Sequence, residues 1–204
     1  MQVTTRVVAL IVLGVLLFEC SIADADPGNE DRVIETTTDV LQCVFSRGED
    51  TAPRNVDALW FVRGSVIPHE DAEWEYTVRQ MGDKGIEVEF LWAQSGRLLG
   101  RPEVVNARTC SDLLSFAKVA RRVVRAEQCA RLRKVVSRYE SLKLPSVPDA
   151  SIRMHASQYV ITAGTAEGDE FQWRLAGWPD ESGSTHPLVV WTEDLRRAIE
   201  SCPQ

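Results

Sequence analysis

Two segments in which apolar and charged residues alternate, joined by a short glycine-containing connection, constrain the fold of this chain most strongly. The apolar positions are Trp74, Tyr76 and Val78 in the first segment and Ile86, Val88, Phe90 and Trp92 in the second. An alternation with a period of two is typical of a β-strand that buries one face. The connection over residues 81–85 contains two glycines, which favour a tight turn. The sequence therefore predicts an antiparallel hairpin over residues 74–92.

The apolar faces of the two strands set the register of this hairpin, because a slip of one residue would turn every aromatic side chain outward. The predicted cross-strand pairs are Trp74 with Trp92, Tyr76 with Phe90, and Val78 with Val88. On the opposite face, Arg79 is then expected to face Glu87.

Four acidic residues lie on that opposite face of the predicted hairpin: Glu73, Glu75, Glu87 and Glu89. Paired carboxylates are what a glycoside hydrolase needs, so these residues are one hypothesis for a catalytic site. The interpretation we favour is a solvated sheet face whose acids discourage edge-to-edge aggregation. A catalytic acid needs a desolvated site that raises its pKa, and the only apolar residue alternating on this face is Leu91.

The remaining elements complete a mixed fold of helices and strands. The pattern predicts a helix over 33–45, a short strand over 58–62 ended by Gly64, a long basic helix over 111–142, strands over 159–163 and 171–175, and a last helix from an N-cap at Thr192 to about Cys202. The element order is therefore α-β-β-β-α-β-β-α. We predict the α+β class, with residues 32–204 forming a single domain in which helices pack on one antiparallel sheet.

The N-terminus has the layout of an export signal. Residues 1–6 carry one positive charge, and the apolar run over 7–18 is shorter than the roughly 20 residues that a membrane-spanning helix needs. Small residues at Ala23 and Ala25 suit a signal peptidase. We expect a signal peptide over 1–23, a polar and mobile lead-in over 24–31, and no stable membrane insertion after cleavage.

A lipid anchor at Cys20 is an open alternative to this cleavage. A bacterial lipobox has a small residue before its cysteine, whereas this chain has Glu19 there. The sequence therefore favours cleavage over lipidation, and it favours a periplasmic or secreted location for the protein.

Four cysteines remain after cleavage, namely Cys43, Cys110, Cys129 and Cys202. An even number in an exported chain favours two disulfides, which leaves three connectivities. At the two ends of the predicted long helix, Cys110 and Cys129 would lie roughly 28 Å apart, and a bridge allows only about 7 Å between Cα atoms. We prefer Cys43–Cys110 with Cys129–Cys202 among the other pairings. With no CxxC motif and no paired histidines, neither a metal site nor a cofactor is predicted.

The charge of the chain is divided unevenly. Between Lys118 and Lys143 nine basic residues stand against Glu127 and Glu140, a local charge of +7 within a chain of net charge −7. On the predicted helix these basic residues fall on two faces, and a helix that tracks phosphates would keep them on one. The charge pattern therefore argues against a nucleic-acid partner and favours charge pairing within the fold or with a partner protein.

Five residues are candidates for contact with a partner: Trp60, Trp178, Lys118, Arg122 and Arg125. Aromatic and arginine side chains are enriched where proteins bind one another. The sequence has no HExxH, Gly-x-Ser-x-Gly or Ser-x-x-Lys motif, which leaves enzymatic activity without a recognisable signature.

These observations favour a non-enzymatic, exported bacterial protein that binds another protein or a component of the cell envelope, as an inhibitor or an immunity-type factor. The alternative is a small cell-wall-directed hydrolase that uses the glutamates of the hairpin.

Overall fold

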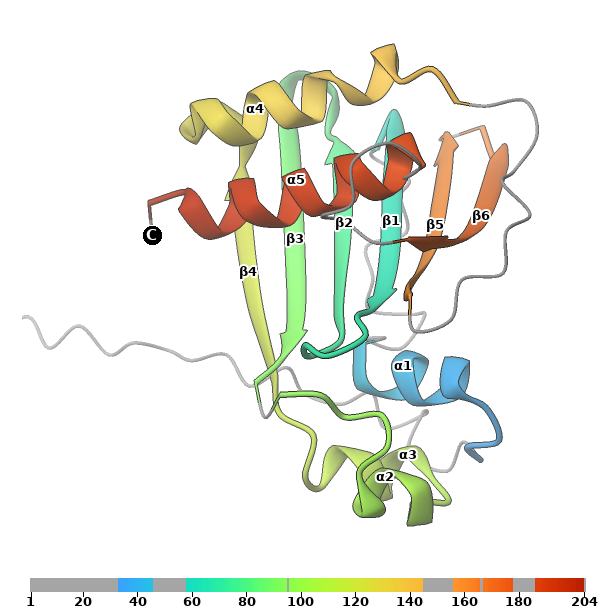
Figure 1. Cartoon of the computed structure of the whole chain (residues 1–204). Coiled ribbons are helices and arrows are strands. Elements are labelled where there is room, and N and C mark those ends of the chain that lie inside the picture. Colours follow the sequence, from blue (N-terminus) through green and yellow to red (C-terminus); the bar gives the residue numbers. More distant parts are fainter. Residues whose placement is uncertain are drawn as a thin grey trace, which may run out of the picture.

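The predicted hairpin lies within a six-stranded antiparallel sheet with the order β4-β3-β2-β1-β5-β6 (Figure 1). The computed structural model describes residues 33–45, 58–94, 96–144, 156–165, 167–177 and 186–203. The strands are β1 (Trp60–Ile67), β2 (Trp74–Gln80), β3 (Ile86–Ala93), β4 (Val119–Arg125), β5 (Ser157–Thr165) and β6 (Glu170–Gly177). The helices are α1 (Thr37–Phe45), α2 (Pro102–Asn106), α3 (Cys110–Leu114), α4 (Ala130–Ser137) and α5 (Pro187–Ser201), with short 3₁₀ turns at Gly82–Lys84, Ala126–Gln128 and Tyr139–Ser141. The predicted α+β class is confirmed.

The register of the central hairpin is confirmed at every predicted pair. The pairs are Trp74 with Trp92, Tyr76 with Phe90, Val78 with Val88, and Arg79 with Glu87. The two strands predicted near the C-terminus are β5 and β6, which pair with each other, and β5 also pairs with β1. Strict alternation of buried and polar positions is therefore a sufficient guide for these strands.

The predicted long helix over 111–142 is wrong. A capping box at Thr109 and Asp112 does begin a helix there, but that helix, α3, ends at Leu114. Residues 119–125 form β4, which pairs with β3 and places Ala120 and Val124 toward the core. The segment gains more from completing the ladder of β3 and burying Val124 than from helical propensity. The order of the regular elements becomes α-β-β-β-α-α-β-α-β-β-α.

Two of the boundaries that differ from the prediction involve the side chain of Tyr76. Gly64 does not end β1; it lies within the strand, beneath that ring, where a Cβ atom would collide with Cε1 of Tyr76. The hydroxyls of Tyr76 and Thr192 lie 3.0 Å apart in a hydrogen bond. Thr192 is therefore buried inside α5, and the N-cap of this helix is His186.

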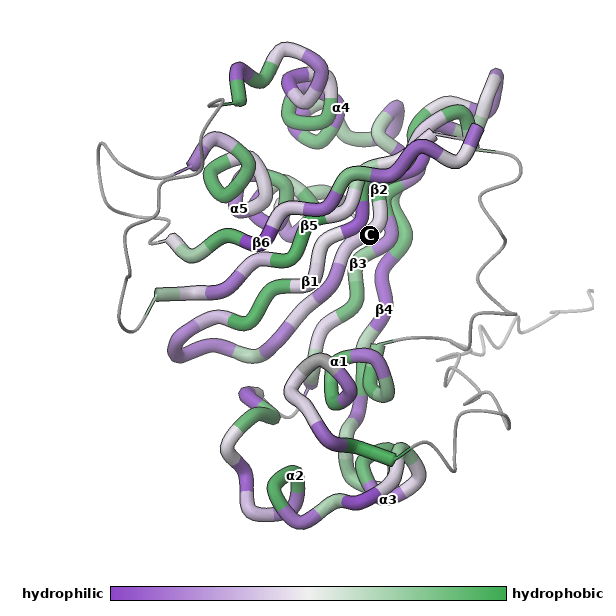
Figure 2. Tube along the Cα trace, turned by 90° about the vertical axis from the view of Figure 1, so that its right-hand side faces the viewer, coloured by the Kyte–Doolittle hydropathy of each residue, from purple (hydrophilic) through white to green (hydrophobic). Residues whose placement is uncertain are grey.

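Helices cover one face of the sheet and one of its ends (Figure 2). α4 and α5 pack on the aromatic face and form the main core with it. α1, α2 and α3 form a second apolar cluster at the end of the sheet where β3 leaves it and β4 enters. The other face of the sheet carries the charged side chains.

Each core cluster is held by one disulfide, and the preferred connectivity is confirmed. Cys43–Cys110 joins α1 to the start of α3, and Cys129–Cys202 joins the start of α4 to the end of α5. The distance argument against Cys110–Cys129, however, depends on a long helix that the chain does not form. Two disulfides are consistent with folding in an oxidising compartment. Among the residues that the structure describes, no helix is long and apolar enough to span a membrane.

Several expectations concern residues outside the described ranges. These are the signal peptide over 1–23, the lead-in over 24–31, the open question of lipidation at Cys20, and the candidate contact Trp178.

Candidate functional site

Three of the four glutamates of the hairpin are buried rather than solvated, which corrects our preferred interpretation of that face, and Glu87 is half-buried. Glu73 is 0% exposed, Glu75 is 5% exposed and Glu89 is 7% exposed. Buried carboxylates require partners, because an unpaired charge out of water is costly. The partners of each glutamate therefore decide what it can do.

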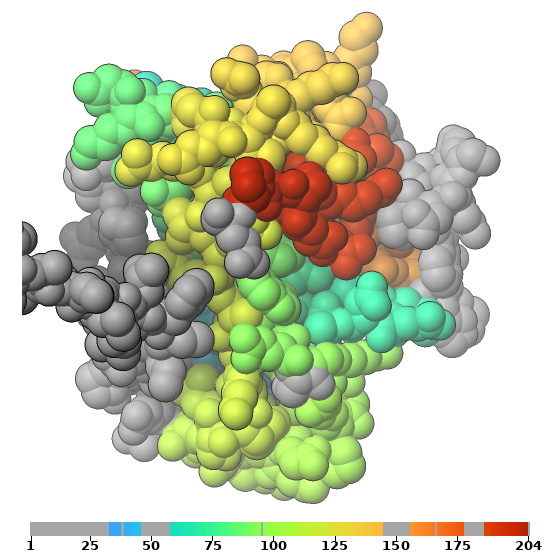
Figure 3. Space-filling model, turned by 90° about the vertical axis from the view of Figure 1, so that its left-hand side faces the viewer, coloured from blue at the N-terminus to red at the C-terminus, as the bar shows by residue number. Residues whose placement is uncertain are grey.

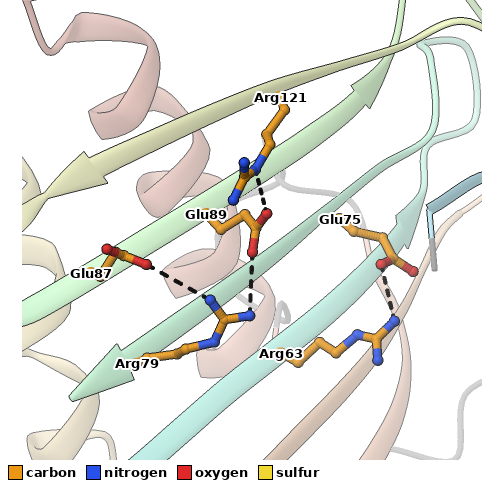
Figure 4. Close-up of polar contacts among 6 residues, drawn as sticks. All are labelled: Arg63, Glu75, Arg79, Glu87, Glu89 and Arg121. Carbon is orange, nitrogen blue, oxygen red and sulfur yellow. Dashed lines mark hydrogen bonds and ion pairs between the residues drawn. The ribbon is translucent and has the colours of Figure 1, made fainter. Parts of the chain in front are cut away.

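Glu89 and Glu87 belong to an ion-pair network on β2, β3 and β4 (Figure 4). Arg79 lies between the two acids, 3.2 Å from Glu89 and 3.8 Å from Glu87. On the other side of Glu89, Nε of Arg121 donates a hydrogen bond of 2.7 Å. The residue directly opposite Glu89 on β2 is Thr77, so Glu89 contacts Arg79 diagonally across the two strands. Glu89 is thus held between two guanidinium groups.

Glu73 has a structural role at the end of the hairpin. Its carboxylate accepts hydrogen bonds from the backbone N–H groups of Leu98 at 2.6 Å and Leu99 at 2.9 Å. This anchors the connection that follows β3, and Leu98 itself is fully buried in the second cluster. A carboxylate occupied in this way fixes the backbone rather than facing a ligand.

Glu75 differs from the other three because it lines a polar pocket. The Ser65 hydroxyl donates to its carboxylate at 2.5 Å, and Nη2 of Arg63 lies 3.3 Å away. Burial, only partly offset by Arg63, raises the pKa of Glu75 above its usual range. The pocket has a volume of about 610 Å³ and lies among α1, β1, β5 and β6. Its polar lining includes Gln158, Thr162, Gln172 and Arg174, and Glu75 is the one acid among the described residues that line it.

Replacing Glu75 with glutamine is expected to change how stability depends on pH. A folded-state pKa above the unfolded value means that the stability contributed by protonated Glu75 is present below about pH 4.5 and is lost as the pH rises through the raised pKa. Glu75→Gln should remove that loss and leave the protein at least as stable as the wild type at neutral pH. Urea unfolding of both proteins, followed by circular dichroism between about pH 4.5 and neutral pH, measures this difference in the free energy of unfolding.

Glu89→Gln is the matched control for that substitution. It places the same amide on the same face but leaves Arg79 and Arg121 without their shared carboxylate, so it should destabilise the protein at neutral pH. Equal losses of stability in the two variants would contradict the distinction we draw between them.

A second pocket, the aromatic pocket, lies on the opposite face beneath the C-terminal half of α5. Its volume is about 470 Å³. The lining residues are Asp71, Ala72, Trp74, Phe90, Trp92, Arg122, Arg196, Ile199 and Glu200. An adjoining pocket of about 440 Å³ shares Trp92 and Arg122 and extends to the Cys129–Cys202 disulfide. Figure 3 shows this side of the molecule, where the end of α5 lies between α4 and the β1–β2 connection.

The arginines of the aromatic pocket are held in place by the fold. The guanidinium carbon of Arg196 lies 5.7 Å from the ring centroid of Trp74, within the range of a cation–π contact. Arg196 also forms ion pairs with Glu193 at 3.3 Å and Asp71 at 3.7 Å. Nη2 of Arg122 donates to the carbonyl oxygen of Cys202 at 2.5 Å and to that of Pro203 at 3.3 Å. The pocket therefore has an aromatic wall and two oriented cations.

The structure does not bring the predicted partner-contact residues together. Arg122 lines the aromatic pocket, but Lys118 and Arg125 are exposed at either end of β4. Trp60 is half-buried and stacks on Tyr139, with ring centroids 6.0 Å apart. Only Arg122 among the four described candidates thus lines this pocket.

Sequence reasoning missed Trp92 and Arg196 as members of this site. The alternation of β3 places Trp92 on the core face, and its ring does contact that of Phe90, with centroids 5.4 Å apart. Trp92 is only half-buried because the residue directly opposite it on β4 is Ala120, whose small side chain does not cover the ring. A small residue at that position in a recognised strand would have been the signal for a pocket.

Neither the metal-ligating residue types nor comparison with known proteins indicates a particular function. Within the described part of the chain, no group of three or more histidine, cysteine, aspartate or glutamate residues is placed to hold a metal ion. Comparison of the chain with family models, curated proteins and solved structures finds no match. The chemistry of the two pockets is therefore what distinguishes the candidate functions.

Proposed function

We propose that this is an exported protein, periplasmic or secreted, that binds a partner protein without catalysis, as an inhibitor or immunity-type factor. The observation that carries the proposal is the aromatic pocket, where Trp92 and Arg122 line a preformed hollow. Tryptophan and arginine are among the side chains most enriched at energetically dominant contacts between proteins. A volume of about 470 Å³ suits side chains projecting from a partner.

The way this pocket is built favours binding over chemistry. Its two arginines are already held by acidic or carbonyl partners, so the fold fixes two cations that can orient a bound partner. The Cys129–Cys202 bridge lies in the adjoining pocket and fixes the end of α5 against the start of α4. A site ordered in advance loses little conformational entropy when a partner binds, which increases affinity.

Trp92→Ala is expected to weaken partner binding by about 2–4 kcal/mol, which corresponds to a loss of affinity of roughly 30-fold or more. The partner would first be captured from periplasmic and secreted fractions on the immobilised protein and identified by mass spectrometry. Titration of the purified pair by calorimetry then measures the loss. Arg122→Gln, which preserves the aromatic wall, should weaken binding through the same site.

Trp60→Ala is the control for this experiment. Trp60 is also a half-buried tryptophan facing the main core, but it lies at the other end of the strands and stacks on Tyr139. Its replacement should leave the affinity unchanged. A partner that binds Trp92→Ala as tightly as the wild type would refute the aromatic pocket as the binding site.

A cell-wall hydrolase is the second candidate, and the polar pocket around Glu75 is the observation that favours it. A buried carboxyl group whose pKa is raised is what a general acid requires. The candidate lacks a second carboxylate in the described lining of that pocket, and Glu89 is engaged by Arg79 and Arg121. Incubation with purified peptidoglycan separates the two functions. Release of soluble fragments by the wild type, lost in Glu75→Gln, would replace the binding proposal with this one.

A further inference from the structure

β6 is a sheet edge with exposed side chains. Among the residues that the structure describes, it pairs only with β5. Glu170, Gln172 and Arg174 are exposed on the charged face of the sheet, and Phe171 is 66% exposed on the other face. An edge with a large exposed aromatic side chain is a site where another strand can add to the sheet.

The free backbone groups of this edge belong to the charged-face residues. Thr165 donates its N–H to the carbonyl of Asp169 at 3.1 Å, which marks that pair as hydrogen-bonded. Hydrogen-bonded pairs alternate along an antiparallel ladder, so Phe171 and Trp173 direct their backbone groups toward β5. It follows that Glu170, Gln172 and Arg174 direct their N–H and C=O groups away from the sheet.

The sequence of this edge is complementary to itself. When two copies of β6 are laid antiparallel with Gln172 opposite Gln172, Glu170 of each copy falls opposite Arg174 of the other. Phe171 then falls opposite Trp173 on the other face. Directly opposed residues of opposite charge, or with aromatic rings, stabilise a strand pair by about 0.2–1 kcal/mol each. Arg174 has no hydrogen bond or ion pair with the residues that the structure describes, so it is available for this contact.

We propose that two copies of this chain associate by pairing β6 with β6 about a twofold axis at Gln172, so that one sheet runs through both. In this register Gln172 faces Gln172 and Glu170 faces Arg174. These are the residues whose N–H and C=O groups point away from the sheet, so they form the hydrogen-bonded pairs between the two copies. A shift by two residues keeps the backbone bonds but loses both ion pairs. The interface uses the same strand in both copies, so it closes at the dimer. A single strand pair buries less area than a permanent dimer does, and dissociation constants on the order of micromolar to millimolar are expected.

Charge reversal at Arg174 tests the register. Arg174→Glu replaces both ion pairs of the dimer with Glu–Glu contacts, and it should raise the dissociation constant of the dimer about tenfold or more. Sedimentation equilibrium over a range of protein concentrations measures this constant. Arg197→Glu, at an exposed position on α5, changes the net charge equally and should leave the constant unchanged.

Exchange of the two charges is the decisive variant. Glu170→Arg alone should weaken the dimer, whereas Glu170→Arg combined with Arg174→Glu recreates both ion pairs with their signs reversed and should restore wild-type affinity. Both positions are exposed, so unchanged thermal unfolding of each monomer is expected. A wild-type protein that stays monomeric up to millimolar concentration would overturn the proposal, as would a double variant no tighter than either single one.

A cysteine at the twofold axis gives a second, independent measurement. Directly opposed residues of a hydrogen-bonded pair have Cα atoms about 5.5 Å apart, a separation that a disulfide spans. Gln172→Cys should therefore form a covalent dimer under mild oxidation. Gln158→Cys, on β5 and also exposed, should not. Equal crosslinking at the two positions would contradict pairing through β6.

Discussion

Replacing Cys129 and Cys202 together with alanine should lower the free energy of unfolding by about 2–4 kcal/mol. The bridge closes a loop with a sequence separation of 73, so its loss gives the unfolded chain considerable freedom. Both cysteines are buried in the main core, between α4 and α5. Urea unfolding of the double variant, compared with the wild type without reductant, measures the difference.

The other bridge supplies the contrast for this prediction. Cys43 and Cys110 lie in the second cluster, which contains no residue of α4 or α5. Their replacement should cost amide protection against hydrogen exchange in α1 and α3 while the amides of β1 and β2 stay protected. A loss of protection spread evenly over the sheet would show that the two clusters unfold as one unit.

Trp191→Ala is expected to lower the free energy of unfolding by about 3–5 kcal/mol, a large effect for a single substitution. Trp191 is 1% exposed and holds α5 against its neighbours. Its ring centroid lies 5.9 Å from that of Tyr76 on the sheet and 5.1 Å from that of Tyr139, which follows α4. Its indole N–H donates to the carbonyl of Val135 at 2.9 Å. Alanine would leave a cavity at the junction of three elements and would remove the indole donor from the Val135 carbonyl, which still accepts from the backbone N–H of Arg138.

Trp191→Phe separates these two contributions. Phenylalanine fills most of the space but cannot donate to Val135, so a loss of about 1–3 kcal/mol is expected. Denaturant unfolding followed by far-ultraviolet circular dichroism measures both variants without relying on tryptophan fluorescence. Equal losses for the two variants would mean that packing of the indole ring contributes little.

The features that could be predicted from the sequence are those that depend only on residues close together in the chain. The alternation from Trp74 to Val78 and from Ile86 to Trp92 determines both strands and the face that each side chain takes, because a slip of one residue would turn the aromatic rings outward. The helix predicted to start at residue 111 does start at Cys110, because the capping box that Thr109 forms with Asp112 is also a signal between neighbouring positions.

What could not be predicted depends on contacts between distant segments. Residues 119–125 carry arginines that suit a helix, and they become a strand because β3 offers an unpaired edge to them. The burial of Glu75 depends on Ser65 and Arg63, which reach it from another strand. The aromatic pocket needs Trp92 from the sheet and Arg196 from the last helix, which are far apart in the sequence.

The ion pairs of the charged face also discriminate between alignments that the aromatic face cannot tell apart. A shift of β3 by two residues along β2 would still bury an apolar side chain at nearly every position of the core. On the charged face, however, one such shift places Glu89 directly opposite Glu75. Two buried carboxylates would then be neighbours across the strands, and their like charges would destabilise the pairing. Arg79 on β2 reaches Glu89 in the native alignment, and this shift would move the two residues apart. The buried carboxylates therefore raise the free energy of the misaligned sheet, which hydrophobic burial alone would not distinguish from the native one.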